Sequence, residues 1–235
     1  LVQKPIEPGE EYVYEFTTGP DGTRWYHSHG KNELTAAQQI DMGLSGPFII
    51  EPRTPTVEYD REYTLLLDEW DVLPGGVNPA VGHIHGAATP GAVPEFNTFT
   101  INGRIFPYVD PIKLKEGEKV LIRIINGGTT AVHPMHTHGH EFELVALDGN
   151  PVPRAAIQER NVYTVHPGET ADFLLTANNP GVWLFHCHHV HHASAGMIML
   201  IEYEGFDAPT TEDLRKMKAE ALEAGGETDG HDHTH

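Results

Sequence analysis

The segment W-L-F-H-C-H-H-V-H-H-A-S-A-G-M, residues 183–197, places the only cysteine of the chain among histidines and ends on a methionine. Imidazole is the commonest metal ligand in proteins, and thiolates bind soft metals. Successive side chains of a strand point to opposite faces, so His186 and His188 would share one face while Cys187 projects from the other. One strand could therefore serve two metal sites.

Two further H-x-H pairs have the same spacing. W-Y-H-S-H contains His27 and His29, and M-H-T-H-G contains His136 and His138. A period of two residues puts both imidazoles of each pair on one face of a strand. Together with the pair that flanks Cys187, they predict one cluster of metal ligands.

A separate site is predicted on the face to which Cys187 points. His133 and His192 are the imidazoles placed to join the thiol, and Met197 adds a thioether. A thiolate, two imidazoles and a weak axial methionine form the trigonal site of blue copper, whereas structural zinc usually takes more than one cysteine in a closed tetrahedron. The donor set favours copper, and packing in the core is the alternative role for Met197.

The other histidines contribute less. His83 and His85, in G-H-I-H-G, are expected in a loop or in a weak copper-capture site, and the terminal H-D-H-T-H in a solvated tail. Four more are expected to lie behind the ligands or at the surface: His140, His166, His189 and His191.

Composition limits the classes of partner. The 235 residues carry a formal net charge of -19 at pH 7, which argues against nucleic acid or an anionic membrane as partner. The sequence has no run of about 18 apolar residues, the pattern that would predict a membrane span. A single cysteine excludes an internal disulfide, and the 17 histidines outnumber the 15 lysines and arginines, as a metal-binding protein would show.

Short apolar or alternating runs, separated by glycine, proline, asparagine and aspartate, predict an all-β protein. Their recurrence is typical of a sandwich. The runs are 11–16, 48–51, 63–68, 120–125, 142–147, 172–176 and 197–203.

Turn-forming residues suggest the domain organisation. Residues 72–95 are rich in glycine and proline and are expected to link an N-terminal domain at 1–71 to a C-terminal domain at 96–206. The first range holds too few strands to close a sandwich alone. Residues 207–235 are expected to form one surface helix after Pro209, followed by a disordered tail.

The histidine motifs, H-P-M-H-T-H-G at 133–139, H-C-H-H-V-H-H-A-S-A-G-M at 186–197 and W-Y-H-S-H at 25–29, resemble those of the laccase-like multicopper oxidase family. The resemblance implies two cupredoxin-like Greek-key β-sandwich domains, the first incomplete at its N-terminus. Only 103 residues separate His29 from His133 (133 minus 29, less one), so the chain is similar to the two-domain members.

The same resemblance implies four coppers for each complete active unit. The type 1 copper would be held by His133, Cys187, His192 and Met197, and the type 2 copper by His136. The type 3 coppers would take His27, His29, His138, His186 and His188. Two-domain members usually form homotrimers whose three-copper cluster lies between neighbouring subunits. The family's upstream H-x-H-G is expected to precede Leu1. One alternative is that the protein has an incomplete cluster, and another is that His83–Gly86 replaces the motif.

By this likeness the protein is expected to oxidise phenols or aromatic amines one electron at a time, with substrate meeting His192 at the surface, and to reduce O2 to water. The sequence has only five methionines and no methionine-rich insertion, which argues against a cuprous oxidase. An electron-transfer protein with only the type 1 site is one alternative. Copper nitrite reductase is another, which the histidines on both sides of Cys187 disfavour. The family implies secretion or a periplasmic location.

Overall fold

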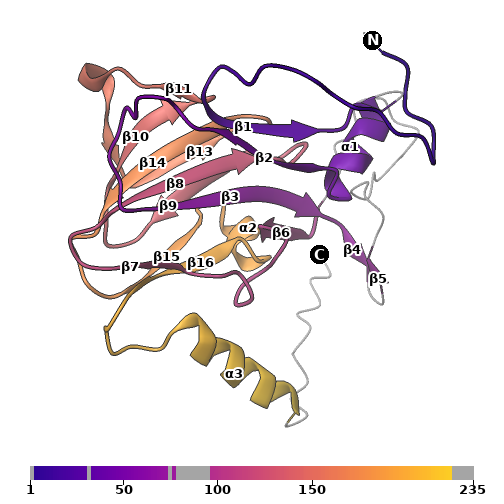
Figure 1. Cartoon of the computed structure of the whole chain (residues 1–235). Coiled ribbons are helices and arrows are strands. Elements are labelled where there is room, and N and C mark those ends of the chain that lie inside the picture. Colours follow the sequence, from indigo (N-terminus) through magenta and orange to yellow (C-terminus); the bar gives the residue numbers. More distant parts are fainter. Residues whose placement is uncertain (1–2, 31–32, 74–75, 78–95, 224–235) are drawn as a thin grey trace.

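Two β-sheets pack face to face in the computed structural model, which describes residues 3–30, 33–73, 76–77 and 96–223 (Figure 1). The larger, seven-stranded sheet has the order β11 (Asn150–Pro151), β10 (Phe142–Leu147), β14 (Thr170–Thr176), β8 (Lys119–Asn126), β3 (Arg61–Trp70) and β6 (Thr98–Ile101), with β12 (Glu159–Arg160) paired to β10. The five-stranded sheet has the order β13 (Val162–Val165), β9 (His133–Thr137), β15 (Val182–Cys187), β16 (Ile198–Tyr203) and β7 (Ile112–Leu114).

Smaller elements surround this sandwich. Two short antiparallel pairs are β1 (Gly22–His27) with β2 (Ser45–Ile50), and β4 (Val72–Leu73) with β5 (Gly76–Val77). The helices are α1 (Glu33–Asp41), the 3-10 turn η1 (Arg154–Ala156), α2 (Val190–Ser194) and α3 (Thr211–Glu223).

One hydrophobic core fills the space between the sheets. Phe142 and Phe173 of the larger sheet stack with ring centroids 3.9 Å apart, and Phe185 and Ile201 of the smaller sheet belong to the same buried cluster. Each such side chain contributes roughly 1.5–3 kcal/mol when fully buried. The predicted all-β class is confirmed. The same core packs against β15, which carries Cys187, and against β9, which carries His133.

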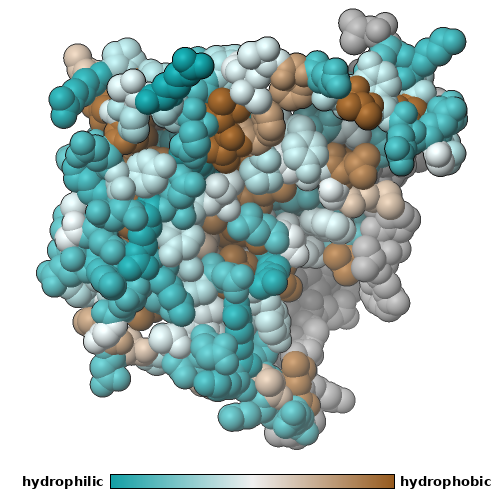
Figure 2. Space-filling model, in the orientation of Figure 1, coloured by the Kyte–Doolittle hydropathy of each residue, from teal (hydrophilic) through white to brown (hydrophobic). Residues whose placement is uncertain are grey.

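The prediction of a strand at residues 11–16 is wrong. The structure has no strand between residues 3 and 21, and Tyr12, Val13, Tyr14 and Phe16 are all more than half exposed. Alternation predicts a strand only where a partner can satisfy its backbone groups, and within the described part of the chain this segment has no strand partner. Figure 2 shows hydrophobic atoms along the edge where β1, β2 and α1 lie, while hydrophilic atoms cover most of the remaining face.

Strand β3 joins the two expected domain ranges. It pairs in parallel with β8, from Arg61 opposite Val120 to Leu67 opposite Asn126, and antiparallel with β6. Residues 61–70 of the range 1–71 therefore lie in the sheet built by residues 96–206. The linker at 72–95 stays a prediction, because residues 78–95 lie outside the described part of the chain.

A buried polar network holds β1 against the outer side of the larger sheet. The Thr23 hydroxyl donates to the Asp172 carboxylate at 2.7 Å, and the Arg123 guanidinium donates to Thr23 at 3.0 Å and to Asp172 at 3.2 Å. All three side chains are nearly inaccessible to water. Burial raises the pKa of Asp172, an effect opposed by the hydrogen bond from Thr23 and the charge of Arg123. The position of the W-Y-H-S-H segment follows from this contact.

Helix α3 lies in the range where a surface helix is expected. Thr210 and Asp213 form a capping box, in which the Asp213 carboxylate accepts the Thr210 N–H at 2.9 Å. The Arg215 guanidinium donates to the carbonyl oxygens of Pro107, Tyr108 and Val109, which fastens the helix to the sandwich. Residues 224–235, with the histidine tail, lie outside the described residues.

Candidate metal centres

The neighbouring strands β9 and β15 carry two groups of side chains on opposite faces. In their antiparallel register His186 lies opposite His136, and Cys187 lies opposite Met135. Cys187 and His133 are fully buried on the inner face, whereas His136 and His186 are half-buried on the outer face. The strand period predicts this separation, and the structure shows it.

The inner face brings one thiol and two imidazoles together, which we call the thiol group. The Cys187 Sγ lies 3.8 Å from His133 Nδ1 and 3.6 Å from His192 Nδ1, and the two Nδ1 atoms are 3.2 Å apart. Three ligands that bind one ion at about 2.0–2.3 Å in a trigonal or tetrahedral arrangement are held roughly 3.3–3.9 Å from one another. The spacing and the soft sulfur donor fit a copper ion.

The environment keeps these ligands uncharged when no metal is bound. Burial lowers the pKa of His133 to about 3, helped by the neighbouring rings of His192 and His189. Burial likewise lowers the pKa of His192 to about 4, helped by His189 and His191. Burial raises the pKa of the Cys187 thiol to about 11. Two neutral imidazoles are ready to bind, and the thiol must lose its proton to the incoming metal.

Met197 is tied to the thiol group through its backbone. Its N–H donates to the carbonyl of His192 at 3.0 Å, and its carbonyl accepts the Cys187 N–H at 3.1 Å. The side chain is fully buried. Its role as axial ligand stays a prediction.

The outer face gathers three imidazoles, which we call the imidazole group. His136, His138 and His186 each present one ring nitrogen within 4.8 Å of the others, and the Nε2 atoms of His138 and His186 are 3.0 Å apart. The pKa of His138 is lowered by burial and then by the rings of His136, His186 and His188. The pKa of His186 is also lowered, mainly by burial.

Backbone carbonyls orient two of these rings. His136 Nδ1 lies 2.6 Å from the Asn161 carbonyl oxygen, and His186 Nδ1 lies 2.9 Å from the carbonyl of Cys187. In each pair the ring N–H is the donor, since a carbonyl oxygen can only accept. In the neutral form of each ring, Nε2 is then the nitrogen left to bind metal, an arrangement usual for histidine ligands.

His188 lies beside the imidazole group. Its ring centroid is 5.2 Å from that of His136 and 6.0 Å from that of His186. Among the described residues, the groups whose ligand atoms converge are limited to the thiol group and the three imidazoles of the imidazole group.

His27 and His29 stand apart from both groups. Their ring centroids are 5.0 Å apart, and His27 stacks on Trp25 at 4.5 Å. The Trp25 indole N–H donates to the Gly168 carbonyl, and His27 Nδ1 lies 3.0 Å from the Ser28 carbonyl. This chain alone does not bring the pair to His136, His138 and His186.

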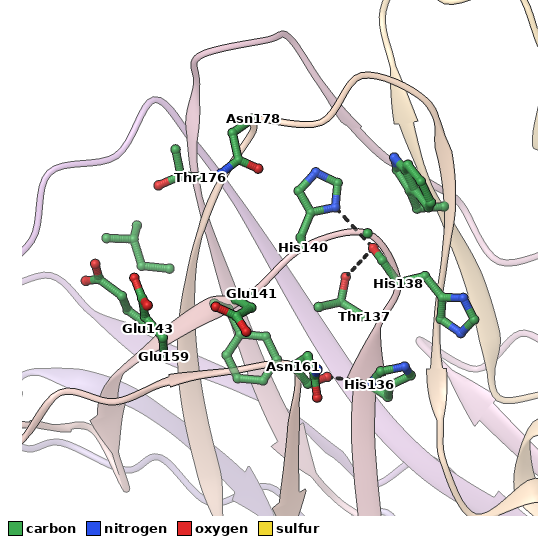
Figure 3. A pocket seen from close by; sticks show the side chains of 14 residues that line it. His136, Thr137, His138, His140, Glu141, Glu143, Glu159, Asn161, Thr176 and Asn178 are labelled. Carbon is green, nitrogen blue, oxygen red and sulfur yellow. Dashed lines mark hydrogen bonds between the residues drawn. The ribbon is translucent and has the colours of Figure 1, made fainter.

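The imidazole group opens into a pocket at the end of β9. Figure 3 shows His136 and His138 at one side of it, with Glu141, Glu143 and Glu159 further along its wall. Solvent and small molecules can therefore reach the outer face, in contrast to the thiol group.

His140 supports the imidazole group from behind. It is 6% exposed, its Nδ1 lies 3.1 Å from the His138 carbonyl, and its Nε2 lies 2.7 Å from the Tyr203 hydroxyl. Gly139, between the two histidines, has a φ of +68°, and a Cβ there would come within 2.6 Å of the Trp183 ring. Glycine is therefore required at this turn.

Three rings surround His192, and they correct its expected exposure. Phe99 of β6 stacks on one side with a centroid distance of 3.9 Å and an interplanar angle of 18°. His189 stacks with a distance of 4.1 Å and an angle of 11°, while His191 meets it at 6.1 Å and 62°. His192 is only 7% exposed, so the expectation that it lies at the surface is wrong. No pattern near His192 indicated Phe99, which is distant in sequence.

Buried carboxylates on β3 and α1 were also missed. Glu69 is fully buried and accepts hydrogen bonds from the Thr130 hydroxyl at 2.8 Å and the Ala131 N–H at 3.0 Å, which holds the loop that leads into His133. Burial raises the pKa of Asp68 to about 8 and that of Asp41 to about 7. The apolar run of β3 indicated burial of Asp68 and Glu69, but it did not indicate their partners.

Two family models match the chain, both described as multicopper oxidase, one over residues 78–205 and the other over residues 1–55. Laccase-13 of Arabidopsis thaliana is 31% identical over 231 residues, an alignment that covers 93% of this chain and 37% of that protein. The chain therefore spans well under half of that curated relative.

Solved structures agree with this match. The blue copper oxidase from Nitrosomonas europaea has a TM-score of 0.71 and 34% identity, with 88% of this chain and 64% of that chain covered. The copper nitrite reductase from Nitrosomonas europaea also has a TM-score of 0.71, with 26% identity and coverage of 87% and 69%. The fold is cupredoxin-like, and the donor sets fit copper. The chain belongs to the multicopper oxidase family.

Proposed function

We propose that the protein is a laccase-like oxidase that takes single electrons from phenols or aromatic amines and reduces O2 to water. The observation that carries this proposal is the back-to-back placement of the two groups. Cys187 belongs to the thiol group, and His186, its chain neighbour, belongs to the imidazole group. A single peptide unit therefore links the place of reductant oxidation to the place of O2 reduction.

The proposed ligand sets follow the motifs and the geometry together. The type 1 copper is assigned to His133, Cys187, His192 and Met197, and the type 2 copper to His136. The type 3 pair is assigned to His27, His29, His138, His186 and His188. Copper, when bound, accepts single electrons at the type 1 site and supplies four of them to O2 at the three-copper cluster.

The protein excludes water from the thiol group and fixes the orientation of rings in the imidazole group. Complete burial of Cys187 and His133 excludes water, which preserves the copper geometry during electron exchange. The carbonyl oxygens of Asn161 and Cys187 fix the rings of His136 and His186, so that Nε2 faces the cluster in each.

A homotrimer is proposed as the working assembly. His27, the last residue of β1, and His29 form a ligand pair, yet within one chain they lie outside the imidazole group. A neighbouring subunit that presents its own His27 and His29 to the imidazole group would add these two ligands to the cluster. The small reducing substrate and O2 are the remaining partners. No helix in the described ranges has the length and apolarity to span a bilayer, and a secreted or periplasmic location is proposed from the family.

The test combines copper counting with oxygen uptake on the full chain. We expect about four coppers per chain, a blue absorption band and a near-ultraviolet band from the coupled pair. A phenol should be oxidised with a ratio of four phenols to one O2. One copper per chain with only the blue band would instead indicate an electron-transfer protein.

Copper nitrite reductase is the second candidate, because a nitrite reductase structure matches the fold with a TM-score of 0.71. Such an activity would need no coupled copper pair, so the second histidine beside Cys187 would be unused. Nitrite consumption under anaerobic conditions, without phenol-dependent O2 uptake, would support this candidate and exclude the first.

A further inference from the structure

One exposed imidazole continues the ring stack of the thiol group to the surface. His189 follows the H-C-H motif directly and lies outside the ligand sets assigned above. Its ring is parallel to that of His192 within 11°, with the centroids 4.1 Å apart, and the residue is exposed. His192 itself is 7% exposed.

The other side of His192 is closed. Phe99 stacks on it at 3.9 Å, and Phe99 is 3% exposed. His192 is therefore held between an inner phenylalanine ring and an outer imidazole ring. A planar molecule that approaches from solvent meets His189 before it can reach either face of His192.

His191 offers a natural comparison within the same turn. It is exposed as well, but its ring meets that of His192 at 62° with a centroid distance of 6.1 Å. His189 and His191 are thus both exposed histidines, and they differ in how their rings contact the ring of His192.

We propose that the reducing substrate docks on the ring of His189, and that its electron reaches His192 across the stacked imidazoles. The proposal rests on the proposed function. A planar phenol or aromatic amine is the class that fits, because flat rings stack on an exposed imidazole face. His189 is then a substrate-contacting residue, and the ring of His192 receives the electron without direct contact.

The step balances for a phenol. Each phenol loses one electron through His189 and one proton to solvent water, and becomes a phenoxyl radical. Four such events supply four electrons and four protons, which convert one O2 to two water molecules. Copper(II) is the immediate oxidant, and O2 is the final one.

Anaerobic reduction of the copper-loaded full chain isolates this step. The protein is mixed with 2,6-dimethoxyphenol, and the bleaching rate of the blue band is followed. His189→Ala should slow bleaching by about tenfold, since loss of a positioned contact can cost one to two orders of magnitude. His189→Phe keeps a flat ring and should restore most of the rate.

His191→Ala is the matched control and should bleach within about twofold of the parent, because the His191 ring lies at 62° to that of His192 and is not stacked on it. Each variant keeps the backbone N–H of residue 189, which lowers the pKa of the Cys187 thiol. Copper content and blue-band intensity should therefore be equal in all four proteins, which shows that ligation is intact.

A second readout needs no copper. In the metal-free full chain, titration with 2,6-dimethoxyphenol should shift the imidazole NMR signal assigned to His189 and leave that of His191 in place. Bleaching of His189→Ala as fast as the parent, or faster, would overturn the proposal, because the edge of His192 would then be the contact. A slow His189→Phe, or a shift confined to His191, would also overturn it.

Failure of the proposed function is a different result. A parent protein that lacks phenol-dependent O2 uptake would contradict the oxidase assignment. The NMR titration would still decide whether His189 is the docking ring.

Discussion

The thiol group and the imidazole group are adjacent in sequence and opposite in environment. Cys187 and His133 are fully buried and His192 nearly so, whereas the three members of the imidazole group are half-buried, and two of them, His136 and His138, border an open pocket. The buried group has its donor atoms at metal-binding separations within one chain. The outer group has three of the six ligands assigned to its cluster; His188 lies beside it, and His27 and His29 lie elsewhere.

This difference shows how one strand can support two kinds of chemistry. A dry, closed group suits exchange of electrons, because little around the metal has to move. An open group suits a small molecule that must enter, receive protons and leave as water. Four predictions test how independent the two groups are.

The largest effect is expected for Cys187→Ser, which removes the soft donor from the thiol group. The hydroxyl is a poor ligand for this metal, so the blue band should vanish and copper should fall by one per chain. Absorption and metal analysis check this, and the near-ultraviolet band should persist. His166→Ala, at an exposed position, is the control. A blue band that survived in Cys187→Ser would contradict the assignment.

His138→Ala should break the other group alone. The Nε2 atom of His138 lies 3.0 Å from that of His186. Loss of the His138 ring should weaken copper binding at the cluster by at least about 100-fold, which is more than the loss of a residue that only supports a ligand costs. The near-ultraviolet band and O2 uptake should disappear while the blue band remains. If the blue band fell equally, the two groups would be coupled.

Acid should destabilise the metal-free protein through the thiol group. In the folded protein the pKa values of His133 and His192 are about 3 and about 4, whereas in the unfolded chain both have the usual value of 6.5. At a pH between the folded and unfolded values, the unfolded state therefore binds more protons than the folded state. The free energy of unfolding should therefore fall as pH decreases below 6.5, by up to about 1.4 kcal/mol per pH unit for each histidine.

Urea unfolding at pH 7, 6 and 5 measures this slope. A variant with both His133→Leu and His192→Leu should show a shallower one. Buried carboxylates such as Asp68 act in the opposite direction, since a raised pKa lowers stability as pH increases, and they are common to both proteins. Equal slopes would show that the two histidines do not titrate as their burial implies.

The smallest effect is expected for Thr23→Val, which removes the hydroxyl between Arg123 and Asp172. The buried partners lose one hydrogen bond each, at a cost of about 1–3 kcal/mol. Hydrogen exchange should rise in β1, which carries His27, while the blue band stays unchanged. Thr54→Val, at an exposed position, should change stability by less than about 0.5 kcal/mol. Unchanged exchange in β1 would show that other contacts hold it.

Features set by local geometry were predictable from sequence. The inward direction of Cys187 and the outward direction of His186 depend only on the alternation of side chains along a strand. The grouping of His136, His138 and His186 followed from two such pairs on neighbouring strands. The metal type followed from the donors themselves.

Features that depend on distant partners were not predictable in this way. Residues 11–16 alternate as a strand does, but strand formation needs a neighbour that the pattern cannot supply. The place of β3 depends on its pairing with β8, and the burial of His192 depends on Phe99 of β6. Nothing in the spacing of H-C-H-H-V-H-H distinguishes the stacked ring of His189 from the tilted ring of His191.

The parallel pairing of β3 with β8 also bears on how the chain is made. Arg61 pairs with Val120, so 59 residues separate the partners (120 minus 61). At synthesis rates of about 5–20 residues per second, β3 waits about 3 to 12 seconds for its neighbour. During that interval its three consecutive leucines and its unpaired amide groups face solvent, the condition under which nascent chains associate with each other.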